Sequence, residues 1–165
     1  DLLRGQGRGS RLVPPTETQM LKSMEEVYER VEQLSKLAGY KIVISQAERA
    51  KLLCTESCRQ FGHCYAMNGE AAFVDASGKI YACSSLIGNE DFYIGNVQDG
   101  LDNTLVKKVS DKIFQSMSFC RECIDFKLCG GGCFARWYGS GAKVAYKSEC
   151  AMKRISIKMI GESEK

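Results

Sequence analysis

Apolar residues recur every three or four positions after Thr16, which is the pattern of a helix with one packed face. These positions are Met20, Leu21, Met24, Val27, Val31, Leu34, Leu37 and Ala38. Thr16 and Gln19 have the spacing of a capping box, and Gly39 is a typical helix stop. The sequence therefore predicts a long amphipathic helix, followed by a short strand over 40–45 and a two-turn helix over 46–53.

Beyond residue 64 the pattern changes to short β-prone segments. Residues 71–75 and 79–83 flank the turn residues Ala76, Ser77 and Gly78, which predicts a β-hairpin with Cys83 at its end. Helical spacing returns over 102–117 and again over 148–161. We therefore expect a small cysteine-rich α+β domain with a β-hairpin and helices, preceded by the amphipathic helix and strand.

Composition and charge place the chain among ordinary globular proteins. It has 165 residues, of which 44% are hydrophobic and 26% charged, so one core is expected. The net charge of +3 is too small to predict binding to nucleic acid or to an anionic membrane. Because no secretory signal and no apolar run of about 20 residues is present, a cytoplasmic location is expected. The Gly/Arg-rich residues 1–15 are expected to be a linker or flexible segment.

Cysteine is the most informative residue type, because the chain has nine of them, an odd number. They are Cys54, Cys58, Cys64, Cys83, Cys120, Cys123, Cys129, Cys133 and Cys150. A small secreted scaffold would pair its cysteines in disulfides, whereas thiolate ligands for metal are the better interpretation for this chain. Four cysteines fall between residues 120 and 133, where Gly130, Gly131 and Gly132 permit tight turns.

Two kinds of metal site compete for these cysteines. Structural zinc sites commonly use two CxxC pairs, and this sequence has one such pair, Cys120 and Cys123. Iron–sulfur clusters accept thiolates from distant parts of a chain, so eight cysteines would supply two [4Fe-4S] clusters. The spacing favours iron–sulfur clusters. The predicted position of Cys150 in the first turn of a helix would also favour its thiolate form.

The cysteine spacing resembles the seven-cysteine signature of SPASM domains, which are C-terminal extensions of radical S-adenosylmethionine enzymes. The matching features are Cys64, Gly78, Cys83, the run Cys120-x2-Cys123-x5-Cys129-x3-Cys133, and Cys150. The resemblance implies a first [4Fe-4S] cluster held by Cys58, Cys64, Cys83 and Cys133. It implies a second cluster held by Cys120, Cys123, Cys129 and Cys150. Cys54 is an alternative to Cys58 or a surplus thiol, and the single histidine, His63, is not expected to be a ligand.

The sequence departs from radical S-adenosylmethionine enzymes at one motif. Their own cluster needs a CxxxCxxC loop, but after Cys54 and Cys58 the third position is Phe61. The resemblance therefore implies that the chain is the C-terminal part of a larger enzyme. Residues 16–53 would be a helix–strand–helix bridge from the end of a partial (β/α) barrel, and residues 54–165 the SPASM domain. S-adenosylmethionine and a third [4Fe-4S] cluster would bind only in that barrel.

The same resemblance implies an enzyme that modifies a peptide or protein, by a thioether or other crosslink or by side-chain oxidation. The auxiliary clusters would transfer electrons, bind substrate, or both. The expected partners are the barrel of the same enzyme, a peptide or protein substrate, and an electron donor such as flavodoxin or ferredoxin. The alternatives are a stand-alone ferredoxin-like electron carrier and a zinc-stabilised binding module. Arg121, Lys127 and Arg136 are candidates to offset the charge of the clusters.

Overall fold

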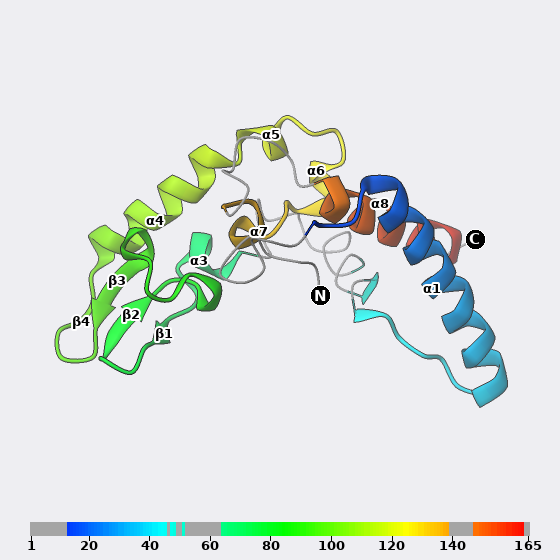
Figure 1. Ribbon diagram of the computed structural model, residues 1–165, viewed down its shortest axis with the longest axis horizontal. Coiled ribbons are helices and arrows are strands. Elements are labelled where there is room, and N and C mark those ends of the chain that lie inside the picture. The colour runs from blue at the N-terminus through cyan, green and yellow to red at the C-terminus, as the bar shows by residue number, and fades with distance from the viewer. Residues whose placement is uncertain (1–12, 46, 49–50, 52–63, 139–146, 164–165) are drawn as a thin grey trace.

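The computed structural model describes residues 13–45, 47–48, 51, 64–138 and 147–163. Its helices are α1 (Glu17–Ala38), α3 (Tyr65–Asn68), α4 (Asn103–Ser116), α5 (Ser118–Arg121), α6 (Phe126–Cys129), α7 (Phe134–Tyr138) and α8 (Lys147–Ser163). Its strands are β1 (Phe73–Val74), β2 (Lys79–Tyr81), β3 (Tyr93–Asn96) and β4 (Gly100–Leu101), with short 3-10 turns η2 (Ser84–Leu86) and η3 (Glu90–Phe92) between β2 and β3. The predicted α+β class is confirmed. In Figure 1 the sheet and α4 lie at one end of the molecule, α1 and α8 at the other, and α5, α6 and α7 between them.

The four strands form one antiparallel sheet in the order β1-β2-β3-β4. Its first hairpin, between β1 and β2, is the predicted one. In its turn, Asp75 Oδ1 accepts hydrogen bonds from the backbone of Ser77 (2.8 Å) and Lys79 (3.0 Å), and Gly78 is left-handed at φ +84°. The strands β3 and β4 were not predicted. They approach closely because residue 95 is a glycine, at which a Cβ would lie 2.1 Å from the Gly100 carbonyl oxygen.

Both helices predicted for the second half of the chain are confirmed. α4 begins where the Asp102 carboxylate accepts hydrogen bonds from the backbone of Thr104 and Leu105, an N-cap that satisfies two otherwise unpaired N–H groups. Its Val109 and Ile113 side chains are buried. α8 covers the predicted range 148–161. Among the described residues, no helix is both long and apolar enough to span a membrane.

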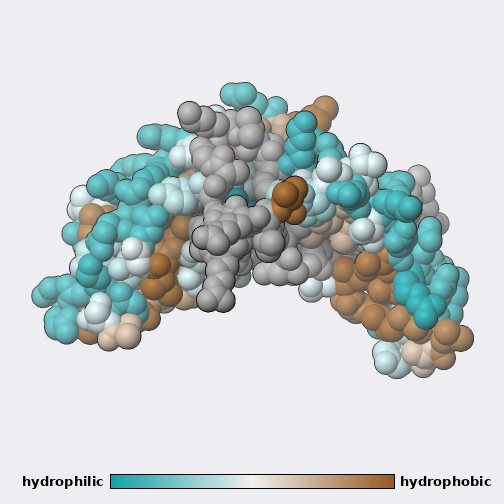
Figure 2. All heavy atoms as spheres, viewed as in Figure 1, coloured by the Kyte–Doolittle hydropathy of each residue, from teal (hydrophilic) through white to brown (hydrophobic). Residues whose placement is uncertain are grey.

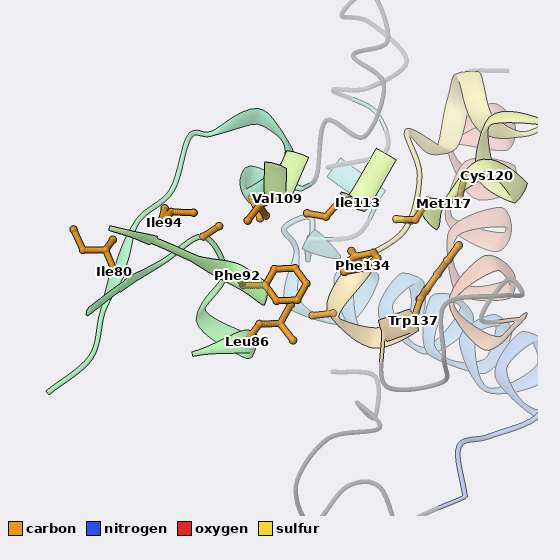
Figure 3. Close-up of a cluster of buried hydrophobic side chains, with 13 residues drawn as sticks. Ile80, Leu86, Phe92, Ile94, Val109, Ile113, Met117, Cys120, Phe134 and Trp137 are labelled. Atoms are coloured by element: carbon orange, nitrogen blue, oxygen red, sulfur yellow. The ribbon is translucent and has the colours of Figure 1, made fainter. Parts of the chain in front are cut away.

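The buried core extends from the sheet to the cysteine-rich segment. Figure 3 shows it as a row of side chains that begins at Ile80 and Ile94 in the sheet. Phe92 and Phe134 occupy the middle, with their ring centroids 5.7 Å apart, and Trp137 lies at the far end with Met117 and Cys120. One continuous core therefore holds the sheet in a defined position relative to the cysteines.

The amphipathic helix predicted after Thr16 is confirmed as α1, with its capping box and a left-handed Gly39. It packs along α8, where the Tyr28 hydroxyl donates a buried hydrogen bond to Ser156 Oγ (3.0 Å). The packed face is narrower than predicted, because one helix covers only a stripe of its neighbour. Val27 and Leu37 keep 45% and 80% of their surface exposed. Figure 2 shows hydrophobic side chains gathered at the end of the molecule where α1 lies.

The strand predicted over 40–45 is wrong. Residues 41–44 form no strand, and the Ile42 N–H instead donates to the Ser35 hydroxyl of α1 (2.9 Å). A β-prone segment needs a neighbouring strand, and in the described ranges every strand lies between residues 73 and 101. Ala47, Glu48 and Lys51 are helical, in agreement with the helix predicted over 46–53 as far as it is described.

Candidate metal centre

The segment from α5 to α7 carries four cysteines through a series of tight turns. Cys120 lies in α5, and the Cys123 N–H donates to its carbonyl oxygen (3.1 Å). Cys129 ends α6, which stops because Gly130 takes a left-handed conformation at φ +66°. Cys133 immediately precedes α7. Hydrogen bonds between close neighbours in the chain therefore set the spacing of these thiols.

Four cysteines converge beside this segment, and we name them the second cysteine set: Cys120, Cys123, Cys129 and Cys150. Three come from the turns around α5 and α6, and Cys150 comes from the first turn of α8. Burial raises the pKa of Cys120 to about 12, and the charges of the other three members contribute to this rise. All four also line one cavity, so the four thiols lie near one another.

The second cysteine set lines a cavity of about 220 Å³. Phe119, Phe126 and Trp137 line the same cavity, so part of its wall is apolar. Burial raises the pKa of Cys150 to about 11. In the metal-free chain, burial therefore disfavours the charged thiolate form of Cys150.

Three further cysteines form a first cysteine set: Cys64, Cys83 and Cys133. Cys64 precedes α3, and Cys83 lies between β2 and η2. Burial, followed by the charges of Cys133 and Cys83, raises the pKa of Cys64 to about 11, and hydrogen bonds with the backbone of Met67 and Ala66 oppose this rise. Cys133 thus interacts with a cysteine far earlier in the chain, and it is not among the described residues that line the cavity at Cys129.

The structure brings together seven of the eight cysteines predicted as ligands, in two groups. The eighth, Cys58, lies outside the described residues, as do Cys54 and His63. In the part of the chain that is described, no group of three or more His, Cys, Asp or Glu side chains is arranged to hold a metal ion. Metal ligation by these residues therefore stays a prediction, supported by the proximity of the thiols within each set.

The positive charges beside the second cysteine set are not the ones predicted. Burial raises the pKa of Cys129, and the charge of Lys153 opposes that rise. Lys153 also donates hydrogen bonds to the carbonyl oxygens of Gly131 and Cys129. Arg154 opposes the rise at Cys150 and pairs with Asp125 (2.7 Å). Lys153 and Arg154 follow Cys150 by three and four positions on α8. Because residues with this spacing are neighbours on a helix surface, the helical period predicts that both cations lie near Cys150.

The three predicted cations are engaged differently or exposed. The guanidinium of Arg121 lies 4.2 Å from the centroid of the Phe114 ring. Lys127 is exposed in α6. Arg136 forms a largely buried ion pair with Glu149 (2.8 Å). Adjacency to a cysteine in the sequence was therefore a poor guide to which charge lies beside the thiols.

Glycine is required in the run from Gly130 to Gly132 for two different structural reasons. Gly130 and Gly131 have φ values of +66° and +86°, which side chains rarely adopt, so the tight turn predicted here is confirmed. Gly132 instead makes room for Trp137, since a Cβ there would lie 2.4 Å from Cζ2 of the indole. The Trp137 ring stacks on Phe119 at 4.6 Å between centroids and donates a hydrogen bond to Glu149 (2.9 Å).

Two comparisons with known proteins found no relative. The sequence matches no protein-family model, and a search of curated proteins finds no match. The functional interpretation therefore depends on the arrangement of the cysteines and on the spacing of the motif.

Proposed function

We propose that this chain is the auxiliary-cluster domain of a radical S-adenosylmethionine enzyme that modifies a peptide or protein in the cytoplasm. The first [4Fe-4S] cluster is held by Cys58, Cys64, Cys83 and Cys133. The second is held by Cys120, Cys123, Cys129 and Cys150. The modification is a thioether or other crosslink, or a side-chain oxidation. The clusters transfer electrons, bind substrate, or do both.

The crossed grouping of the cysteines is the observation that carries this proposal. Cys133 interacts electrostatically with Cys64, whereas Cys129 interacts with Cys150. A pair of local zinc knuckles would instead bring sequence neighbours to one ion. The crossing agrees with the ligand arrangement that the resemblance to SPASM domains implies.

The space at the second cysteine set also favours a cluster over a single ion. Four thiolates on one zinc stand about 2.3 Å from the ion, which leaves no room between them. The thiols here line a cavity of about 220 Å³, which suits a group of several atoms. Backbone hydrogen bonds, such as that between Gly132 and Cys120, would stabilise thiolates bound to iron. When bound, such clusters supply one-electron transfer at low potential.

The proposal includes a barrel that precedes this domain and binds S-adenosylmethionine and its own cluster. Contact with that barrel is supported by the exposed apolar side chains of α1, which include Val27, Leu34 and Leu37. A peptide or protein is the substrate, and flavodoxin or ferredoxin is the electron donor.

Anaerobic reconstitution with iron and sulfide tests the proposal. The chain is expected to bind about eight irons and to show broad visible absorption. Cys83→Ala and Cys123→Ala are each expected to lose about half of the iron, because each removes a ligand from a different cluster. Cys54→Ala is the control, since the proposal leaves this thiol unused.

The alternatives give different results in the same experiment. A colourless chain that binds zinc and no iron would contradict the proposal and favour a binding module. Loss of iron in the Cys54→Ala control, with retention in Cys58→Ala, would exchange the ligand assignment between these two residues. A CxxxCxxC loop encoded upstream of Asp1 would favour the enzyme over a stand-alone ferredoxin-like carrier.

A further inference from the structure

Glu149 is a buried carboxylate that contacts both cysteine sets through neighbouring atoms. Its side chain is only 2% exposed, and it precedes Cys150 in the first turn of α8. Its Oε1 accepts hydrogen bonds from the backbone N–H of Cys133 (3.1 Å) and from Arg136 Nη1 (2.8 Å). Its Oε2 accepts one from Trp137 Nε1 (2.9 Å). One side chain therefore links the helix that carries Cys150 to the backbone of Cys133.

The cost of burying this carboxylate makes a mere packing role a poor explanation. Burial of a charge is unfavourable unless the charge is paired and its hydrogen bonds are made, and apolar residues of similar volume often replace such pairs without loss of stability. Glu149 has three donors and a cationic partner, so its oxygens are satisfied. Its charge also lies at the second cysteine set, because Glu149 lines the same cavity as Cys129 and Cys150.

We propose that Glu149 is a positioning residue that couples the two cluster sites. It holds Cys133 of the first cysteine set in place relative to Cys150 of the second, and its negative charge disfavours reduction of both clusters. The redox part of this inference, the effect of Glu149 on cluster reduction, depends on the proposed function. The linkage between the two cysteine sets belongs to the protein itself and can be measured without metal.

Glu149→Gln is the most direct test, because it keeps the shape of the side chain and removes its charge. An amide offers one acceptor oxygen and one NH₂ donor, so it cannot accept hydrogen bonds on both sides as the carboxylate does. In either orientation, a buried N–H group of Trp137 or Cys133 faces another donor. The matched control is Glu122→Gln. Glu122 is exposed and adjoins Cys123, so the same change of charge is made beside a cysteine without touching Cys133.

Two measurements are made on each variant. In the reconstituted chain, redox titration followed by electron paramagnetic resonance is expected to give higher reduction potentials for both clusters in Glu149→Gln. Glu122→Gln is expected to give smaller shifts, because water and salt screen an exposed charge. In the metal-free chain under native conditions, alkylation followed by mass spectrometry is expected to be at least about tenfold faster at both Cys133 and Cys150 in Glu149→Gln, because a broken buried ion pair favours opening.

The outcomes separate this inference from the proposed function. A change confined to the second cluster or to Cys150 would overturn the coupling role, since a disturbance of α8 alone would produce it. Equal behaviour of Glu149→Gln and Glu122→Gln would also overturn it. If the wild-type chain takes up no iron–sulfur cluster, the proposed function is wrong, and the alkylation rates still decide whether Glu149 links the two cysteine sets.

Discussion

Replacement of Gly132 by alanine tests how tightly the cysteine-rich segment is packed. The new Cβ would lie 2.4 Å from Cζ2 and 2.8 Å from Cε2 of Trp137. Carbon atoms in contact normally stand about 3.5–4.0 Å apart, so the indole ring must move by about 1 Å. The ring is only 1% exposed, stacks on Phe119, and is hydrogen-bonded to Glu149, so its surroundings resist this movement.

The expected loss of stability has two sources. Insertion of atoms into a filled core costs about 1–3 kcal/mol. Displacement of the ring also weakens its hydrogen bond to the Glu149 carboxylate, and bonds to charged groups contribute about 1.5–3 kcal/mol. We therefore expect Gly132→Ala to lower the free energy of unfolding by about 3 kcal/mol or more. This is a large part of the stability of a typical domain, which is about 5–15 kcal/mol.

Trp137 is the only tryptophan of the chain, so its fluorescence reports unfolding at this site during denaturant titration of the anaerobically prepared protein. Gly88→Ala is the control, because Gly88 has φ +83° and no atom of the described residues lies within 4 Å of its missing Cβ. It carries backbone strain of about 1–2 kcal/mol without a clash. In a Trp137→Phe background, followed by circular dichroism, the cost of Gly132→Ala should largely disappear. The same cost in both backgrounds, or a fully stable Gly132→Ala, would refute the reasoning.

Two further predictions concern the contact between α1 and α8 and the buried thiols. Tyr28→Phe removes the buried hydrogen bond to Ser156 and should cost about 1 kcal/mol in thermal or denaturant unfolding, whereas Tyr40→Phe, at a residue that is 68% exposed, should cost nothing measurable. An equal effect of the two would contradict the packing described for α1. The pKa values of Cys64 and Cys120 are raised in the folded chain from about 9 to about 11 and about 12, so these thiols stabilise the metal-free protein below about pH 9. That contribution is lost as the pH rises toward 11 and 12. Thermal unfolding of the metal-free chain should therefore show a melting temperature that falls across this range. A constant melting temperature would show that the thiols are not buried as described.

Elements with strong local signals could be predicted from the sequence. α1 has its capping box and terminal glycine, and the first hairpin has its turn at Ser77 and Gly78. Each of these signals depends on hydrogen bonds between residues a few positions apart. The strand over 40–45 was predicted wrongly, and β3 and β4 were missed, because a strand exists only where another strand pairs with it.

The sequence by itself determined the number and spacing of the cysteines, the tight turns at Gly130 and Gly131, and the ends of the main helices, because short-range geometry is enough to specify them. Its resemblance to SPASM domains also implied which cysteines belong together. Only the tertiary structure decided that Arg154 of α8 pairs with Asp125, that Gly132 accommodates Trp137, and that Glu149 joins α8 to Cys133. Most of these contacts connect residues of different elements, so they depend on how α8, α7 and the turns pack together, which no local pattern encodes.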